Sequence, residues 1–196
     1  HEVRLAEALF AEPPQLAALH ARHADVALLG GVQGLAADDA AAVRRMFAEL
    51  LFQSGRPLLA IPPQHPCEWP VRHAVVAWQP TREAARALHD ALPLLEQAAS
   101  VDVLMVDPQQ RSGGHGELPG ADIGAHLARH GLQVNVVARE RGRDSVATAL
   151  LRHAAETGAG LLVAGGFGHS RLREWVLGGT TRELLDALHL PVLFSH

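Results

Sequence analysis

A short, wholly apolar run lies near the end of the chain, at Leu161–Ala164, and Gly165, Gly166 and Gly168 follow it closely. Such a run, bounded by glycines, is typical of a strand that is covered on both faces in a parallel sheet. Glycines at the carboxyl end of this strand let the backbone bend sharply and let a ligand approach its N–H groups. The run therefore predicts a ligand-binding α/β sheet, although glycines that only turn the chain would give the same pattern.

Strand and helix patterns alternate along the chain. In the second part we predict strands at residues 73–78, 101–106, 134–138, 161–164 and 191–195. Between them we predict helices that begin at Thr81, Ile123 and Ser145, and Pro93 should kink or end the first of these. The first part predicts a strand at 25–29, a helix at 39–53 and a strand at 57–61, after weak helical periodicity that Pro13-Pro14 breaks. Such alternation predicts parallel pairing with right-handed crossovers.

The chain contains an internal repeat. ADVALLGGVQG at Ala24–Gly34 matches AGLLVAGGFG at Ala159–Gly168, and Glu49-Leu50-Leu51, Pro57 and Leu59 match Glu183-Leu184-Leu185, Pro191 and Leu193 at one constant offset. Three strands precede the glycines in the second copy and almost nothing precedes them in the first. We therefore expect a partial first repeat at residues 1–66, the end of a proline-rich linker at 67–70 and a complete second repeat at 71–196. By analogy, a complete gene product should carry ~60 more residues upstream.

The spacing of Gly165, Gly168 and Gly178 resembles the signature of the universal stress protein family, G-x2-G-x9-G followed by Ser or Thr. The segments GHSRLREWVLGG and REAARALHDALPLL also resemble a bacterial tandem subgroup of that family. The resemblance implies a site for ATP or a related adenine nucleotide, with its associated Mg²⁺. The binding residues that it implies are Gln79, Ala164, Gly165, Gly168, Gly178, Gly179 and Thr180.

Three positions depart from the pattern of the nucleotide-binding members. Gln79 stands where those members have Asp, Phe167 where many have His, and Gly179 where Ser or Thr belongs, with Thr180 one residue late. Gln can still form hydrogen bonds, but it brings no charge.

For residues 71–196 we predict a doubly wound, parallel, five-stranded sheet with strand order 3-2-1-4-5 and the strand from His73 at its centre. The closing strands 57–61 and 191–195 should lie at sheet edges, and an exposed apolar edge favours pairing. Similar family members dimerise through such strands. We therefore expect Leu58–Ala60 to pair antiparallel with Val192–Phe194, which makes the chain a pseudo-dimer of repeats that could also form a homodimer.

Composition excludes several classes of function. All 17 basic residues are arginine, so a P-loop and Schiff-base chemistry, both of which need lysine, are absent. The formal charge of −4 gives no electrostatic footprint for nucleic acid, and no apolar run is long enough to span a membrane. The single cysteine, Cys67, suits a reducing compartment, so we expect a cytoplasmic protein.

The remaining chemical motifs are weak. His126 and His130 have the spacing of a zinc pair, but no glutamate follows His126 and no third ligand can be placed, so no metal site is predicted. Ser170 follows the glycines without the G-x-S-x-G pattern of a nucleophile, and no catalytic residue is assigned.

Two functions of different class follow from the sequence. The first is a stress-response module that binds an adenine nucleotide at the second repeat, with at most weak ATP hydrolysis. The second is a stress-associated scaffold or interaction protein whose nucleotide site is degenerate. Whether nucleotide binding survives the departures at Gln79, Phe167 and Gly179 separates the two.

Overall fold

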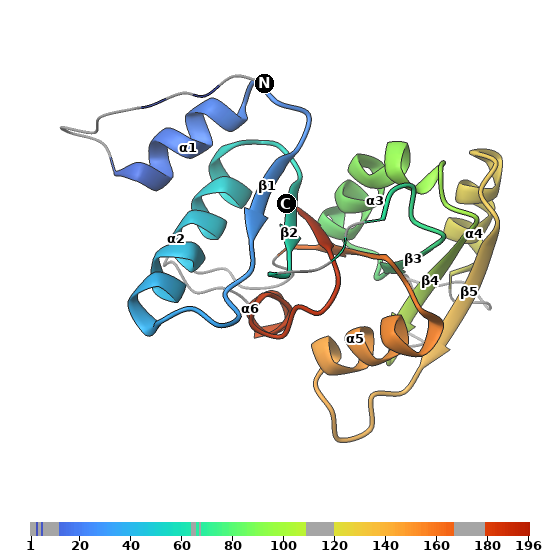
Figure 1. The fold of residues 1–196 in the computed structure, drawn as a ribbon. Coiled ribbons are helices and arrows are strands. Elements are labelled where there is room, and N and C mark those ends of the chain that lie inside the picture. The colour runs from blue at the N-terminus through green and yellow to red at the C-terminus, as the bar shows by residue number, and fades with distance from the viewer. Residues whose placement is uncertain are drawn as a thin grey trace.

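The computed structural model describes residues 3, 5, 12–63, 66, 68–108, 120–166 and 179–196. Helices and strands alternate within each of the two parts of the chain, as the sequence pattern predicts, and β2 is followed directly by β3 where the parts join (Figure 1). The helices are α1 (Pro13–Ala21), α2 (Ala37–Gln53), α3 (Arg82–Leu95), α4 (Ala121–Arg129), α5 (Val146–Thr157) and α6 (Gly179–Asp186). The strands are β1 (Ala27–Gly30), β2 (Leu58–Ile61), β3 (His73–Ala77), β4 (Ser100–Val106), β5 (Val134–Arg139), β6 (Leu161–Gly165) and β7 (Val192–Ser195).

All the strands of the described residues belong to one sheet, in the order β1-β2-β7-β6-β3-β4-β5. The prediction of a five-stranded sheet is therefore wrong, because the sheet has seven strands and β6, not β3, is the middle one. The reason is that β7 is not an edge: β2 and β1 continue the sheet beyond it. The five strands of residues 73–195 lie side by side in the order β5-β4-β3-β6-β7. If these five alone are numbered along the chain, this order is 3-2-1-4-5, and every neighbouring pair among them is parallel.

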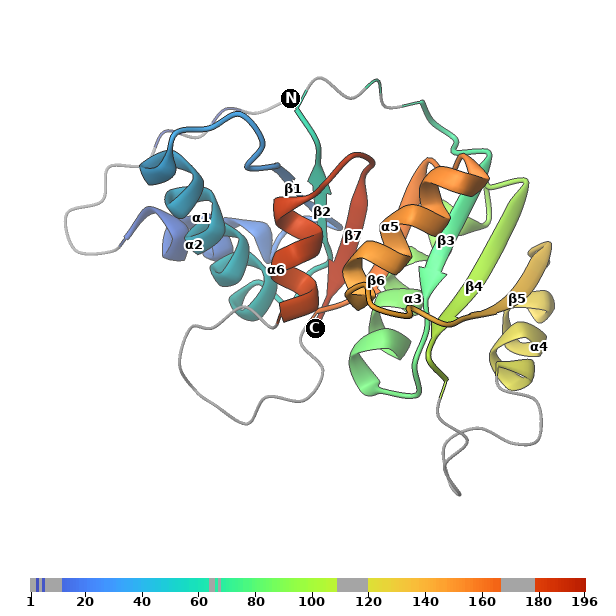
Figure 2. The same cartoon turned by 90° about the horizontal axis from the view of Figure 1, so that it is seen from below.

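The junction between the two parts of the chain is the antiparallel pair β2–β7. Leu59 lies opposite Leu193, and the flanking pairs, Leu58 with Phe194 and Ala60 with Val192, are related by the pseudo-two-fold axis through that central pair. This confirms the predicted pairing of Leu58–Ala60 with Val192–Phe194. Figure 2 shows β2 beside β7, with α1 and α2 of the first part on one side of the junction, α3, α4 and α5 on the other, and α6 across the junction.

The two glycine turns repeat the same local structure. The second glycine of each turn donates its N–H to the last residue of the closing strand, Gly31 to Ile61 O at 2.8 Å and Gly166 to Ser195 O at 2.7 Å. The prolines before the closing strands also accept equivalent bonds, Pro57 from Ala27 N and Pro191 from Leu162 N. The strand registers match as well, with Ala27 paired to Leu58 and Leu162 paired to Val192. The unit β1–α2–β2 therefore has the same hydrogen-bond register as β6–α6–β7.

Apolar side chains cover both faces of the sheet. On one face a continuous cluster joins α1, α2, α5 and α6, and Phe47 of α2 meets Phe194 of β7 edge to face, with ring centroids 5.1 Å apart. On the other face a second cluster includes Leu59 and Leu193 beneath α3 and α4. Because both clusters contain residues from both parts of the chain, the junction is part of the core.

Local signals set several helix ends. Thr81 caps α3 by accepting from Ala84 N, Ser145 caps α5 by accepting from Thr148 N, and Gly158 ends α5 in the left-handed conformation with φ of 64°. Two predictions about proline need correction. Pro13 opens α1 rather than breaking it, since its missing N–H costs nothing in a first turn. Pro93 lies inside α3, which continues to Leu95.

Candidate functional site

The predicted site lies at the carboxyl edge of the sheet, where β3 and β6 are neighbours. These two strands pair in parallel, with Val76 opposite Val163, so Gln79 and Gly165 follow at the same edge. The chain leaves β3 toward β4 on one side and returns to β6 on the other. Such a reversal of strand order is the switch point at which open α/β sheets bind ligands.

Gly165 touches the first turn of α3. A Cβ at this position would lie 2.7 Å from Ala84 N and 2.7 Å from Glu83 C, closer than real Cβ atoms approach backbone. Glycine is therefore required for the end of β6 to meet the amino terminus of α3. The contact places the partial positive charge of that helix end at the switch point.

Glu83 brings a negative charge to the same place. Its side chain is only 12% exposed, and its carboxylate accepts from Arg82 Nε at 2.6 Å. Partial burial pulls the pKa of Glu83 upward, but hydrogen bonds from Arg82 and from its own backbone N–H, with the charges of Arg82 and His196, outweigh burial and leave the pKa below its usual value. A carboxylate at a helix amino terminus is well placed electrostatically, and this one stays charged at neutral pH.

The end of β7 closes the glycine turn. His196 Nδ1 lies 3.1 Å from Gly166 O, and its ring packs edge to face on Phe52 of α2 with centroids 4.8 Å apart. Ser195 Oγ donates to Asp90 Oδ2 at 2.9 Å, and Arg86 Nε donates to the same oxygen. The site thus has contributions from α2, α3, β6 and β7, and both parts of the chain contribute to it.

The structure places only some of the predicted site residues. Gln79 is exposed after β3, Ala164 is buried within β6, and Gly165 is half-buried at its end. Gly179 and Thr180 are exposed and open α6, whose amino terminus points to the carboxyl edge because α6 connects two parallel strands. Gly168 and Gly178 lie outside the described residues, as do Phe167 and Ser170.

A second polar group is buried at the opposite, amino-terminal edge of the sheet. Asp102 of β4 accepts from Asn135 Nδ2 at 3.0 Å and lies 2.8 Å from His153 Nε2 and 3.3 Å from His73 Nε2. Burial raises the pKa of Asp102, but the hydrogen bonds from Asn135 and His153 and the charges of His73 and His153 outweigh it and lower the pKa overall. Because its partners come from β3, β5 and α5, this carboxylate joins those three elements to β4.

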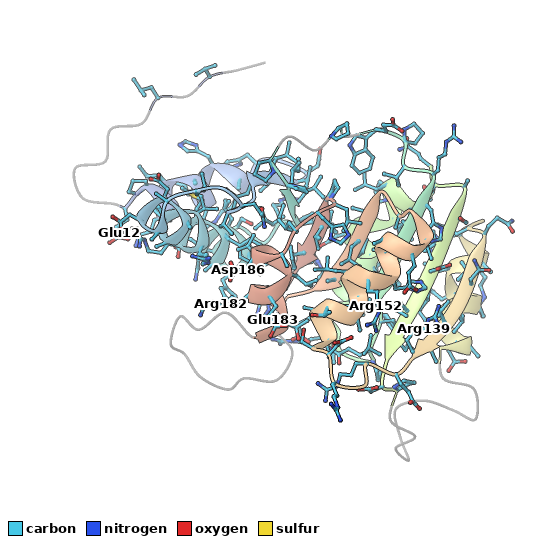
Figure 3. All side chains as sticks on the ribbon, turned by 60° about the horizontal axis from the view of Figure 1, so that its bottom comes forward. Glu12, Arg139, Arg152, Arg182, Glu183 and Asp186 are labelled. Atoms are coloured by element: carbon cyan, nitrogen blue, oxygen red, sulfur yellow. The ribbon has the colours of Figure 1, made fainter. Side chains whose placement is uncertain are left out.

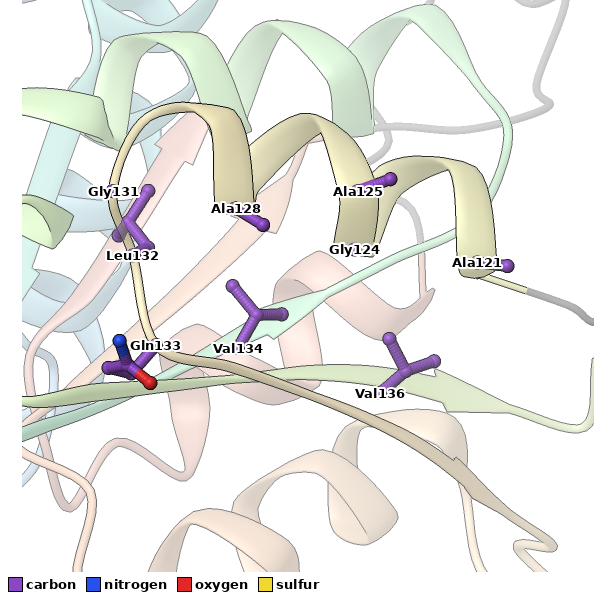
Figure 4. A pocket seen from close by; sticks show the side chains of 9 residues that line it. All are labelled: Ala121, Gly124, Ala125, Ala128, Gly131, Leu132, Gln133, Val134 and Val136. Atoms are coloured by element: carbon purple, nitrogen blue, oxygen red, sulfur yellow. The ribbon is translucent and has the colours of Figure 1, made fainter.

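Two open cavities lie beside β5, away from the switch point. One, of about 500 Å³ between α4 and β5, is lined by small and apolar residues with Gln133 as its one polar side chain (Figure 4). The other, of about 590 Å³, lies at the ends of β4 and β5, where Asp107 accepts from both N and Nε of Arg141. The charged residues that line the second cavity are Asp107, Arg139, Glu140 and Arg141.

Ion pairs lie along α5 and α6, and their side chains are exposed except for those of Arg44 and Asp186, which are half-buried. Arg152 pairs with Asp144 and lies 4.0 Å from Glu156, which also lies 3.9 Å from Arg139, and Asp186 pairs with Arg182 and with Arg44 of α2 (Figure 3). Only the last of these pairs crosses between the two parts of the chain. Exposed pairs of this kind contribute little to stability.

The sequence profile of the universal stress protein family matches residues 70–196, well over half of the chain. The chain belongs to the universal stress protein family. Among solved structures, a universal stress protein from Archaeoglobus fulgidus DSM 4304 aligns with 94% of this chain at 16% identity and a TM-score of 0.69. A functionally unknown protein from Pseudomonas aeruginosa PAO1 aligns with 94% of the chain at 17% identity and a TM-score of 0.55. At these identities the likeness concerns the fold.

The chain covers about two thirds of each of those two structures. The chain spans 65% of the Archaeoglobus protein and 68% of the Pseudomonas protein. No curated protein matches it significantly. Within the part of the chain that the structure describes, no helix is long and apolar enough to cross a membrane.

Sequence reasoning missed three groups in this family member. It assigned no functional role to Glu83, to His196 or to the Asp102 cluster. A charged residue in the turn after a switch-point strand is a signal that could have identified Glu83. The contacts of Asp102 and His196 depend on tertiary pairing, which no local pattern shows.

Proposed function

We propose that this universal stress protein is a stress-response module that binds ATP or a related adenine nucleotide at the carboxyl edge of β3 and β6. The observation that carries the proposal is the contact of Gly165 with the first turn of α3, which leaves no room for a side chain at the switch point. This geometry brings a glycine turn and a helix amino terminus together, and such an arrangement favours anions.

The residue types fit a nucleotide in part. Since the chain has no lysine, phosphates would meet backbone N–H groups of Gly165, Gly168, Gly178 and Gly179, the hydroxyl of Thr180 and the exposed guanidinium of Arg82. Gln79 would face the nucleoside side, and Ala164 would pack beneath it. A Mg²⁺ ion would accompany the nucleotide and neutralise phosphate charge.

One observation favours the alternative function, a scaffold or interaction protein with a degenerate site. The carboxylate of Glu83 already lies at the amino terminus of α3 and is charged at neutral pH. It repels a phosphate that approaches this helix end. The departures from the family pattern at Gln79 and Gly179 also disfavour nucleotide binding.

The proposal includes no catalysis beyond weak ATP hydrolysis. Among the residues that the structure describes, no nucleophile with an oriented base lies beside Gly165, and Ser195 Oγ is bound to Asp90 within the core. A cytoplasmic location, which the single cysteine favours, and a homodimer in addition to the internal junction belong to the same proposal.

A mass spectrum of the gently purified and then denatured protein tests the proposal, because a bound nucleotide is released and identified by its mass. Calorimetric titration with MgATP extends the test to protein that lost its ligand during purification. Nucleotide in the spectrum or saturable heat in the titration supports binding. Absence of both favours the scaffold.

A further inference from the structure

Strand β1 ends the sheet, and one side of it is open. β1 pairs in parallel with β2, and among the described residues no strand lies on its other side. Ala27 and Gly31 direct their N–H groups toward β2, so Leu28, which alternates with them, directs its N–H and C=O to the free side. Leu28 is 62% exposed, although it lies beside the buried Leu59 in the register of the two strands. The apolar face that contains Leu59 therefore continues onto an uncovered strand.

The equivalent strand of the second repeat, β6, shows what covers such a position. The shared hydrogen-bond register equates Ala27 with Leu162, and therefore Leu28 with Val163. Val163 is 0% exposed, because β3 pairs with β6 in parallel and α3 packs over the same face, where Val163 and Leu88 of α3 belong to one apolar cluster. A strand and a helix thus cover in β6 the side that is open in β1.

Gly30 provides a second, independent observation, since the same register equates it with Gly165. A Cβ on Gly165 would meet the backbone of α3 at 2.7 Å, whereas a Cβ on Gly30 meets no described atom within 4 Å. The φ of Gly30 lies outside the left-handed region, so its backbone conformation does not require glycine either. Nothing in the described structure requires a glycine here. A helix amino terminus that packs on Gly30 as α3 packs on Gly165 does require one.

We propose that the free side of β1 is a docking site for a polypeptide segment of the β3–α3 pattern, which is an apolar strand followed by a capped amphipathic helix. The docked strand extends the sheet in parallel beside β1 and bonds to the outward N–H and C=O of Leu28. The docked helix covers the exposed side chains of Val26 and Leu28, and its amino terminus lies against Gly30. Burial of these apolar side chains drives the association.

The test is fluorescence anisotropy of a labelled peptide of residues 71–98, which spans β3 and α3, during titration with the full chain. We expect saturable binding of this peptide and none of a peptide with the same residues in scrambled order. Leu28→Lys should weaken binding by about tenfold or more, because it places a charge in an apolar contact. Val136→Lys is the matched control, since Val136 is an exposed apolar residue of β5 at the other end of the sheet. It should leave the affinity unchanged.

Gly30→Ala separates docking from a role in the fold. The described residues leave room for the added Cβ, so the thermal unfolding of the free chain should not change. Binding of the peptide should weaken by about tenfold, because the Cβ then meets the backbone of the docked helix. Circular dichroism checks that all the variants fold.

The proposal is overturned if the parent chain does not bind the peptide, if Val136→Lys weakens binding as much as Leu28→Lys does, or if Gly30→Ala leaves binding unchanged. Sedimentation velocity of the chain without peptide distinguishes a different occupant. A dimer that Leu28→Lys dissociates would show that a second copy covers β1, which contradicts docking of a strand and helix.

Discussion

Leu59 and Leu193 lie directly opposite each other at the centre of the β2–β7 pair, where the two parts of the chain meet. Leu59 is 6% exposed and Leu193 1% exposed, and both belong to the apolar cluster beneath α3 and α4. The junction is thus built into the middle of a single sheet. Separation of the two parts would expose core side chains on both faces.

Truncation of this pair should destabilise the whole chain. We expect Leu59→Ala and Leu193→Ala each to lower the free energy of unfolding by about 2–5 kcal/mol, as large-to-small changes in a core do. Because the two side chains lie opposite each other, their effects should be coupled. The loss of unfolding free energy in the double variant should therefore differ from the sum of the losses in the single variants. Urea denaturation with one cooperative transition checks this. Two separate transitions in the parent would contradict a shared core.

Removal of the buried carboxylate should change how stability depends on pH. Asp102→Asn should lower the free energy of unfolding by about 1–3 kcal/mol near neutral pH. The reason is that the amide N–H₂ of the new side chain puts a donor where the buried partners of Asp102 need an acceptor. Since the pKa of Asp102 is lowered on folding, its contribution is present above the unfolded pKa of about 4 and is lost as the pH falls through the folded value.

Thermal unfolding of Asp102→Asn and of the parent over a range of acidic pH measures this contribution. The parent should lose stability more steeply below about pH 4, so that the two curves converge on acidification. Parallel curves would show that Asp102 is not charged in the folded protein.

The sequence predicted the order of elements, the repeat and the pairing of the closing strands, because these depend on local periodicity and on residue matches such as Leu59 with Leu193. It failed where tertiary context decides. Pro93 does not end α3, since a proline in the last turn removes only the bond to His89 O and burial of Leu95 holds that turn. The seven-strand count depends on how separate elements pack.

The contact of Gly165 with α3 should make this glycine structurally essential. Gly165→Ala should cost about 1–3 kcal/mol, because the added Cβ meets backbone atoms that cannot move without shifting α3. Gly179→Ala is the matched control, since among the described residues a Cβ there meets only Glu183 Oε1, at 4.0 Å. Chemical denaturation checks the pair, and equal stability of both variants would contradict the described contact.

Neutralisation of Glu83 should improve nucleotide binding. Glu83→Gln keeps the size of the side chain and removes the charge that opposes phosphate at the amino terminus of α3. We expect MgATP to bind a few-fold more tightly, about the effect of one charge contact near the surface. Calorimetry of the variant and the parent checks this, and weaker binding by Glu83→Gln would show that the carboxylate assists the ligand.

The central claim is that a nucleotide binds over the glycine turn and the start of α6. Substitutions at Gly179 test it most directly, because the described residues leave room for a side chain at this position. Gly179→Ser restores the hydroxyl of the family pattern and should tighten MgATP binding by about tenfold through a hydrogen bond to phosphate. Gly179→Asp places a negative charge at the same point and should abolish binding, while Gly179→Ala should resemble the parent.

Calorimetric titration of these three variants and the parent with MgATP is the deciding measurement. We expect the affinity for MgATP to be highest for Gly179→Ser, similar for the parent and Gly179→Ala, and lowest for Gly179→Asp. Equal affinities in all four proteins would place any nucleotide elsewhere, and the absence of binding even by Gly179→Ser would contradict a nucleotide-binding role for this chain.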